Sequence, residues 1–359
     1  MATLFCISGV TGMTGNELVR QILKKPDAQD AVIGFDNFFA SSIETVRDTI
    51  DDPRFSFFEY DITNGTQMRE TEALVRARKQ EFDRTVYINC AAVVHTEYFY
   101  RVNETFDVNV NGMRAFLEQA IRVEADCYIN CSTSEVYSMQ SWNETGGMRE
   151  DDFLTLSTAE HSQRTSYATG KLLTEFFMKD AVDNGKIKGC SIRFANVYSK
   201  NERFAKHIIP HIIGSLLDTG KVVLLDNSKK NRRTFLHNID SCGAVLALIV
   251  AKDALDGSVY NVATDEEITI LDLVALCAAK MGIEHPEIVF EGHRESDPER
   301  RLLSTEKIRT RTGWKPVVTL DEGIAMCVES YTGDEHARKM RDASGNGSTV
   351  HPTERGFMK

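Results

Sequence analysis

The stretch "SGVTGMTGNELV" (Ser8–Val19) places three glycines, Gly9, Gly12 and Gly15, between an apolar run and a segment with helical periodicity. Glycine is needed where a chain turns sharply, where backbone must approach a ligand closely, and where a helix packs tightly on a sheet. The N-terminus of the following helix offers unpaired N–H groups and the positive end of its dipole. An ordinary turn is the alternative. The position of the glycines between strand and helix instead predicts a loop that binds a pyrophosphate.

The surrounding chain alternates short apolar runs with helix-like segments. Strands are predicted at 4–9, 31–36, 55–62, 85–92 and 126–132, and helices at 15–25 and 104–123. A helix at 167–182 and a strand at 190–198 follow, and the pattern then becomes irregular until a strand-like run at 257–263. Strands that alternate with helices imply βαβ crossovers and a parallel sheet covered on both faces.

The predicted fold class is therefore α/β: a Rossmann-type doubly wound parallel sheet with a smaller C-terminal substrate-binding lobe. The dinucleotide-binding domain is expected over 1–195 together with about 235–262, and the lobe over 196–234 and 263–331. Residues 332–359 are polar and rich in Gly, Ser and charge, and they predict a loosely attached tail.

The composition excludes several classes of protein. The chain has 359 residues, 42% of them apolar, and a formal net charge of −11. This length allows a large core, and the acidic balance argues against nucleic-acid binding, which requires a basic face. No apolar run reaches membrane-spanning length, so no membrane partner is expected. The eight cysteines lack metal-site spacing, so we expect no metal, and reduced thiols in the cytoplasm.

An acidic residue after the second predicted strand indicates the cofactor. Asp36 follows the glycines by about twenty residues, where a carboxylate can bind ribose hydroxyls and would repel a 2′-phosphate. This position favours NAD over NADP. The other candidate cofactor-binding residues lie in the glycine loop and at the ends of the second, third and fourth strands: Thr11, Met13, Thr14, Asn37, Asp61, Ile62, Ala91 and Ala92.

A second cluster of residues carries the chemistry. Tyr167 and Lys171 lie four residues apart on a predicted helix and therefore face the same way. A phenol titrates at about 10 in water, and a nearby cation lowers its pKa so that it can exchange protons closer to neutrality. Thr133 ends the fifth predicted strand, at the carboxyl edge where open parallel sheets bind ligands. We expect the three groups to converge on one substrate hydroxyl.

With these motifs the chain resembles the extended short-chain dehydrogenase/reductases that modify nucleotide sugars, the NAD-dependent epimerase/dehydratase family. The glycine motif, Asp36, "STSEVY", the Tyr167/Lys171 pair, "RFANVY" and "GWKPVVTLDEGI" follow the family's order over roughly Met1–Met326. The resemblance implies that the C4 hydroxyl of the sugar is oxidised by NAD. It also implies that Tyr167 takes the proton, that Lys171 holds the cofactor ribose and lowers the tyrosine pKa, and that Thr133 hydrogen-bonds the reacting oxygen.

The residues after Thr133 bear on which reaction follows. A ketone at C4 acidifies the C5 proton, and Glu135 is the candidate base; loss of a hydroxyl from C6 then gives a 4-keto-6-deoxy sugar. Thymidine-diphosphoglucose dehydratases carry Asp-Glu after the threonine, whereas this chain has Ser134, whose hydroxyl is a poor acid. The first expectation is a nucleotide-sugar 4,6-dehydratase in which Glu135 acts as both base and acid. A UDP-glucuronate-type decarboxylase and then a 4-epimerase are the alternatives.

The resemblance also assigns the nucleotide end of the substrate. Asn196 matches a position near the diphosphate, and Arg233 matches an arginine whose planar fork reaches a phosphate oxygen. Arg294 and Asp297 match residues that hold the nucleoside. His95, after the fourth strand, is a candidate for contact with the sugar, and a loop histidine without a ligand is the alternative.

Two further expectations concern partners and competing classes. Family members usually pair through two helices, and the segments 104–120 and 167–182 predict such a homodimer. A non-catalytic NAD-sensing protein on the same scaffold is a distant alternative, because Tyr167, Lys171 and Thr133 are all present. Reduction of a small free carbonyl substrate is disfavoured by the long region after Asn196 with its arginines.

Overall fold

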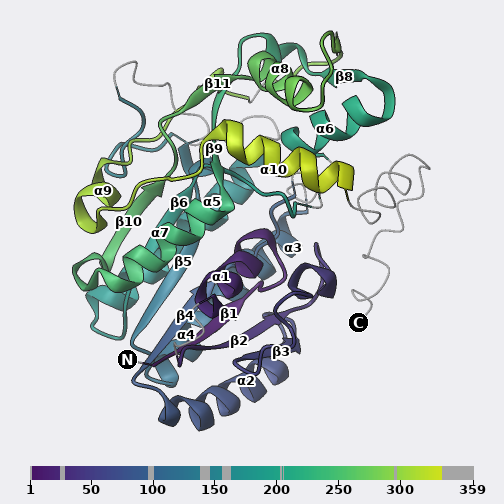
Figure 1. Cartoon of the computed structure of the whole chain (residues 1–359). Coiled ribbons are helices and arrows are strands. Elements are labelled where there is room, and N and C mark those ends of the chain that lie inside the picture. Colours follow the sequence, from purple (N-terminus) through teal and green to yellow (C-terminus); the bar gives the residue numbers. More distant parts are fainter. Residues whose placement is uncertain are drawn as a thin grey trace.

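Seven strands form a central sheet in the order β10-β6-β5-β4-β1-β2-β3 (Figure 1), and every neighbouring pair is parallel. The computed structural model describes residues 2–24, 29–95, 101–137, 146–155, 163–202, 204, 206–294 and 297–333. The strands are β1 (Thr3–Ser8), β2 (Ala31–Asp36), β3 (Phe55–Glu59), β4 (Arg84–Asn89), β5 (Cys127–Thr133), β6 (Lys188–Phe194) and β10 (Asp256–Val262). The strand order reverses between β1 and β4, and ligands bind at such a switch point in open α/β sheets. The predicted fold class is confirmed.

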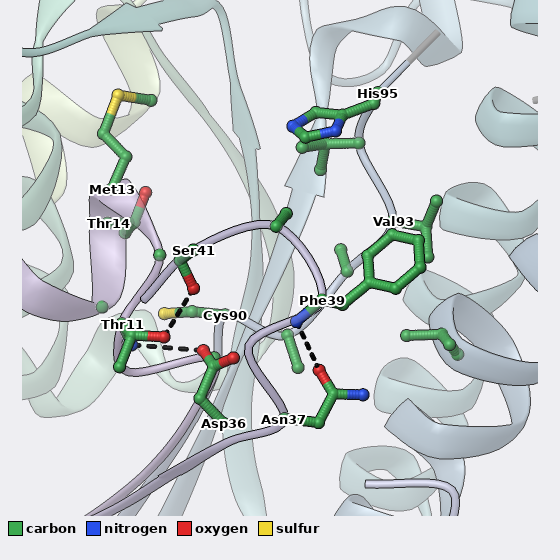
Figure 2. A pocket seen from close by; sticks show the side chains of 18 of the residues that line it. Thr11, Met13, Thr14, Asp36, Asn37, Phe39, Ser41, Cys90, Val93 and His95 are labelled. Carbon is green, nitrogen blue, oxygen red and sulfur yellow. Dashed lines mark hydrogen bonds between the residues drawn. The ribbon is translucent and has the colours of Figure 1, made fainter. Parts of the chain in front are cut away.

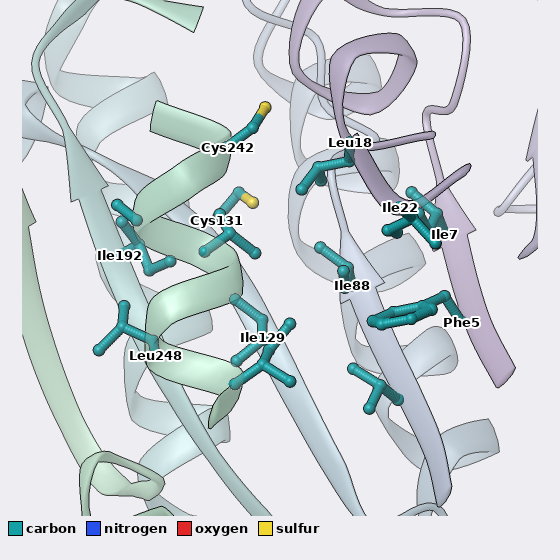
Figure 3. Close-up of a cluster of buried hydrophobic side chains, with 14 of the residues drawn as sticks. Phe5, Ile7, Leu18, Ile22, Ile88, Ile129, Cys131, Ile192, Cys242 and Leu248 are labelled. Carbon is teal, nitrogen blue, oxygen red and sulfur yellow. The ribbon is translucent and has the colours of Figure 1, made fainter. Parts of the chain in front are cut away.

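Helices cover both faces of this sheet because its strands are apolar on both sides. In β1, Phe5 and Ile7 face a core shared with α1 and α7, whereas Leu4 and Cys6 face a core shared with α2, α4 and α5. Figure 3 shows the first of these cores between the sheet and the two helices. These helices are α1 (Met13–Leu23), α2 (Gly65–Arg78), α4 (Met113–Arg122), α5 (Gln163–Asp183) and α7 (Asn238–Val250).

The helix predicted at 104–123 is interrupted. It forms as α3 (Val102–Phe106), a π-helical turn over Asp107–Gly112, and α4. Within that turn, the Asn109 amide accepts a hydrogen bond from the Val93 N–H at 2.6 Å and donates one to the Val93 carbonyl at 3.0 Å. The wider turn thus lets a helix side chain hold the loop after β4, and π turns recur at functional sites.

A second, smaller group of elements packs beside the sheet. The predicted strand at 190–198 is in fact two strands, because the chain leaves β6 at Phe194 and pairs with β9 instead. The region expected to be irregular also contains regular elements, since apolar side chains from several short segments complete a third core. The remaining helices and strands are β7 (Asn196–Tyr198), α6 (Ile208–Thr219), β8 (Lys221–Leu224), β9 (Arg232–His237), β11 (Glu267–Thr269), α8 (Ile270–Lys280), β12 (Glu287–Phe290), β13 (Arg300–Arg301), α9 (Glu306–Thr312) and α10 (Leu320–Gly333). Of these, α9 packs through Ile308 against the first core of the main sheet.

The chain returns to the main sheet through α7 and β10 before it completes the smaller group. We therefore propose the division expected from the sequence, with 1–195 and about 235–262 as the dinucleotide-binding domain and 196–234 and 263–331 as the lobe. Most of the predicted tail, 334–359, lies outside the described residues. Within the described ranges no helix is long and apolar enough to cross a membrane, and all eight cysteines are free thiols.

Candidate active site

The glycine loop shapes one end of a cavity at the switch point. Gly9 has φ +69°, and a Cβ there would lie 2.6 Å from the Ala91 backbone nitrogen. A Cβ on Gly15 would overlap the Gly9 carbonyl oxygen, so the start of α1 and the loop can touch only without side chains. All three glycines line the cavity, and Gly12 precedes α1 with no side chain capping the helix N–H groups. This cradle fits a dinucleotide pyrophosphate.

Asp36, at the end of β2, lines the cavity beside the glycine loop. Its carboxylate accepts a hydrogen bond from the Thr11 N–H at 3.2 Å (Figure 2) and another from the Phe38 N–H at 2.8 Å. Burial raises the pKa of this carboxyl group, while the hydrogen bonds oppose that rise. Asn37 lies beside it and donates to the Asp61 carboxylate at 2.9 Å. The structure thus places Asp36 and Asn37 at the cavity, with Asp61 behind Asn37 rather than among the lining residues.

The other predicted cofactor-binding residues line the same cavity. They are Thr11, Met13, Thr14, Gly15, Ile62, Ala91 and Ala92. Sequence reasoning missed two segments that also line the cavity. Phe39 and Ser41 follow β2, with the Thr11 and Ser41 hydroxyls 2.6 Å apart, and Asn201 and Glu202 follow β7. Small polar and aromatic residues in such loops carry no local pattern that would have marked them.

His95 lies at the opposite wall of the cavity from the glycine loop (Figure 2). Its ring stacks on the Phe204 ring with centroids 3.8 Å apart and an interplanar angle of 9°. The His207 ring stands edge-on to both, 6.0 Å from His95 and 4.8 Å from Phe204. The loop after β4 and the segment after β7 therefore meet over the cavity through an aromatic contact that the sequence did not reveal.

Thr133 and Tyr167 form the second cluster, at the carboxyl end of β5. Both side chains are buried, and a hydrogen bond from Thr133 stabilises the phenolate of Tyr167. Burial nevertheless raises the pKa of Tyr167, and the negative charge of Glu135 raises it further. This direction is opposite to the expected lowering, because the low polarity around a phenol buried between α5 and the sheet disfavours its charged form.

Lys171 follows Tyr167 by one helical turn and is also buried. Its ammonium group donates a hydrogen bond to the Cys131 carbonyl oxygen at 2.6 Å, on the strand that ends at Thr133. Burial lowers the pKa of Lys171. Thr133, Tyr167 and Lys171 are thus brought together around the end of β5, although none of them is among the residues that line the cavity described above.

Glu135 has a partner that the sequence did not suggest. The guanidinium of Arg301 donates hydrogen bonds to both of its carboxylate oxygens, at 2.6 Å and 3.4 Å. The side chains are 3% exposed for Arg301 and 16% for Glu135, so this is a largely buried ion pair. Ser134, between Thr133 and Glu135, is buried as well. The two partners are 166 positions apart, a separation at which no sequence pattern pairs them.

Two of the residues predicted for the nucleotide end pair with each other. Arg233 donates to the Asp297 carboxylate at 3.0 Å, and both side chains are largely buried. The Asn196 amide donates to the Thr234 carbonyl at 3.0 Å, beside Arg233 on β9. Arg294 bonds through its backbone to the Asn227 side chain, with the N–H donating at 2.8 Å. The structure thus gathers Arg233, Asp297 and Asn196 around β9.

The fold and these two clusters define a dinucleotide-binding α/β protein with a tyrosine-centred site at the carboxyl edge of its sheet. The model of the NAD dependent epimerase/dehydratase family matches residues 5–263, and the chain belongs to that family. The resemblance noted in the sequence is thereby confirmed, as are the enzyme class and NAD as the family's cofactor.

Individual proteins agree with this assignment. The chain is 27% identical to the dTDP-D-glucose 4,6-dehydratase of Mus musculus over 74% of this chain and 73% of that protein. It is 25% identical to UDP-glucuronic acid decarboxylase 3 of Arabidopsis thaliana over 90% of this chain and 88% of that protein. The crystal structure of DesIV, a dTDP-glucose 4,6-dehydratase from Streptomyces venezuelae with NAD and TYD bound, shares the fold with a TM-score of 0.79 and 22% identity, covering 94% and 98% of the two chains.

Proposed function

We propose that this protein oxidises the C4 hydroxyl of a nucleotide-diphosphate sugar and then eliminates water from C5 and C6, as an NDP-sugar 4,6-dehydratase. One observation carries the proposal: the Thr133 hydroxyl hydrogen-bonds the Tyr167 phenol, and the Glu135 carboxylate lies close enough for its negative charge to raise the pKa of the same phenol. A proton acceptor, a hydroxyl that can bind the reacting oxygen and a second base thus lie within one site. The relatives that act on nucleotide sugars support the substrate class.

The cavity would hold NAD, which would accept the hydride from C4 and return it to C6 after water has left, so that the cofactor ends the reaction oxidised. The pyrophosphate is assigned to the loop from Gly9 to Gly15 and the N-terminus of α1. Asp36 and Asn37 are assigned to the adenosine ribose, and the small residues Ala91 and Ala92 to the wall beside the cofactor. The carboxylate of Asp36 would repel the extra phosphate of NADP.

The chain's own residues then divide the work. Tyr167, whose phenolate the positive charge of the bound cofactor would stabilise against the raised pKa of the cofactor-free site, removes the proton of the C4 hydroxyl while Thr133 donates a hydrogen bond to the same oxygen. Lys171, whose ammonium is fixed on the Cys131 carbonyl, would hold the cofactor ribose. Glu135 removes the C5 proton that the C4 ketone has acidified, and in the dehydratase it returns a proton to the leaving C6 hydroxyl.

The pairing of Glu135 with Arg301 favours a second candidate, a UDP-glucuronate-type decarboxylase. A carboxylate that accepts two hydrogen bonds from a buried guanidinium is stabilised as an anion and is a poor donor for a leaving hydroxyl. Loss of carbon dioxide from a 4-keto uronic acid needs no such donor, and the neighbouring Ser134 would not have to supply one. A 4-epimerase is the third candidate.

The masses of the products distinguish these reactions. Purified protein is incubated with NAD and a panel of nucleotide sugars, and products are weighed by mass spectrometry. Loss of one water supports the dehydratase, loss of carbon dioxide from a uronic acid supports the decarboxylase, and a new isomer of unchanged mass supports the epimerase. Absence of any product would refute the proposed function.

Glu135→Gln tests the second step by itself. The variant should still oxidise C4, so NADH accumulates, while the rate of C5 proton exchange falls by roughly 100-fold or more. Glu59→Gln, at the exposed end of β3, is the matched control and should behave as wild type. Unchanged product formation in Glu135→Gln would return this residue to a structural role.

We also propose a homodimer formed through α4 and α5. These helices lie side by side, with Arg114 of α4 over the Phe177 ring of α5 at 5.5 Å. The preceding residue of α5, Phe176, is 60% exposed, which suits a buried contact with a second copy. Light scattering should give twice the mass of one chain, and a single-chain mass would contradict the proposal.

The eight free thiols support a location in the reducing cytoplasm.

A further inference from the structure

A buried ion pair lies directly behind the reactive segment. Arg193 of β6 binds the Glu175 carboxylate of α5 through two hydrogen bonds, from Nε at 3.0 Å and from Nη2 at 2.7 Å. The side chains are only 5% and 4% exposed. Removing two charges from water costs about as much as such a pair returns, so stability alone is a weak explanation for its presence. Its contacts indicate what it does instead.

The pair holds both ends of the segment that carries Thr133 and Glu135. On one side, the Ser132 hydroxyl donates to Glu175 at 2.5 Å. On the other, Arg193 Nη1 donates to the Tyr137 hydroxyl at 2.6 Å, and the guanidinium lies over the Tyr137 ring at 4.8 Å. Ser132 immediately precedes Thr133, and Tyr137 ends the 3₁₀ turn that contains Glu135.

The same network reaches the segment that carries the partner of Glu135. The Tyr137 hydroxyl lies 3.0 Å from the Asn261 side-chain oxygen on β10, the strand next to β6 (Figure 1). The Asn261 amide donates to the Met148 carbonyl at 2.9 Å and to the Ser304 carbonyl at 3.2 Å. Ser304 follows Arg301 by three residues. The segments that carry Glu135 and Arg301 are therefore held by one buried set of hydrogen bonds.

We infer that Arg193 and Glu175, acting through the Tyr137 hydroxyl, are positioning residues that fix where Glu135 stands relative to Tyr167 and the substrate. This inference rests on the proposed function, since it concerns removal of the C5 proton. A base must stand within hydrogen-bonding reach of the proton it abstracts, and misplacement by about 1 Å can cost roughly 100-fold in rate. Tyr137 does not touch the reacting atoms. It fixes the 3₁₀ turn that carries Glu135, the residue that does.

Tyr137→Phe tests the inference because it removes one oxygen and leaves the ring against Arg193. The variant should lose roughly 10- to 100-fold in kcat for C5 proton exchange and product formation. Its KM for the nucleotide sugar and its affinity for NAD should stay within about threefold of wild type, and C4 oxidation, seen as NADH formation, should survive. A merely stabilising hydroxyl would lower the unfolding midpoint without changing the ratio of C5 exchange to C4 oxidation in the folded enzyme.

Tyr128→Phe is the matched control. Tyr128 lies on β5 as Thr133 does, is fully buried, and its hydroxyl donates to the Met113 carbonyl at 3.3 Å, away from the network. Its variant should keep the wild-type ratio. An active wild type with the same ratio in Tyr137→Phe would overturn the positioning role alone. Silence of the wild type on every nucleotide sugar would overturn the proposed function, and this role with it.

Discussion

Acidification should destabilise the folded protein through the buried histidine His237. His237 ends β9 and is 2% exposed, and its Nδ1 accepts a hydrogen bond from the Ile239 N–H at 3.2 Å at the start of α7. Burial, assisted by the charge of Lys200, lowers the pKa of His237 from 6.5 to about 4. The neutral ring is therefore the form that the fold accepts, because a protonated Nδ1 could no longer accept the capping hydrogen bond.

The sign and size of the effect follow from proton linkage. Below pH 6.5 the unfolded chain takes up a proton on His237, whereas the folded protein does so only near pH 4. Between these values the unfolded state binds more protons, so the free energy of unfolding falls as the pH falls. Each unit of pKa difference corresponds to about 1.4 kcal/mol, and the contribution lost between pH 7 and pH 4 is about 3 kcal/mol.

His237→Asn is the matched variant for this measurement. Asparagine is a favourable residue at a helix N-terminus and can accept the same hydrogen bond, but it does not titrate. Urea denaturation of both proteins at pH 7 and pH 4 should show that the wild type loses about 3 kcal/mol more than the variant. Other titrating groups are common to both and cancel in the comparison. Equal losses in the two proteins would refute the reasoning.

Other variants test the cofactor cradle and the phenol. Gly15→Ala should lower the free energy of unfolding in urea by about 1–3 kcal/mol and weaken NAD binding, because its Cβ overlaps the Gly9 carbonyl. A variant with wild-type stability and NAD affinity would contradict the close packing. Asp36→Asn should weaken NAD binding roughly tenfold and reduce the preference for NAD over NADP, with the affinity for each cofactor measured by calorimetric titration. An unchanged preference would show that Asp36 does not select the cofactor. Tyr167→Phe should reduce turnover by roughly 10²- to 10⁴-fold with NAD affinity nearly unchanged; full activity would exclude the assigned proton transfer.

The sequence by itself determined the parts of this protein that depend on neighbouring residues. The glycine spacing predicted the loop between β1 and α1, because the positive φ at Gly9 favours glycine and the contact of Gly15 with the Gly9 carbonyl leaves no room for a Cβ. The alternation of strands and helices predicted the parallel sheet, and the family's motif order placed Thr133 and Tyr167 at one end of it. Each of these inferences uses backbone constraints or periodicities that are written within a few positions of the chain.

Only the tertiary structure decided which charges meet. Glu135 finds Arg301 across 166 positions, and Arg233 finds Asp297 across 64. The upward shift in the pKa of Tyr167 likewise depends on burial between α5 and the sheet, and not on the lysine one turn away that suggested the opposite direction. Such effects come from desolvation and from contacts between distant elements, which exist only once the sheet has brought the strand ends together.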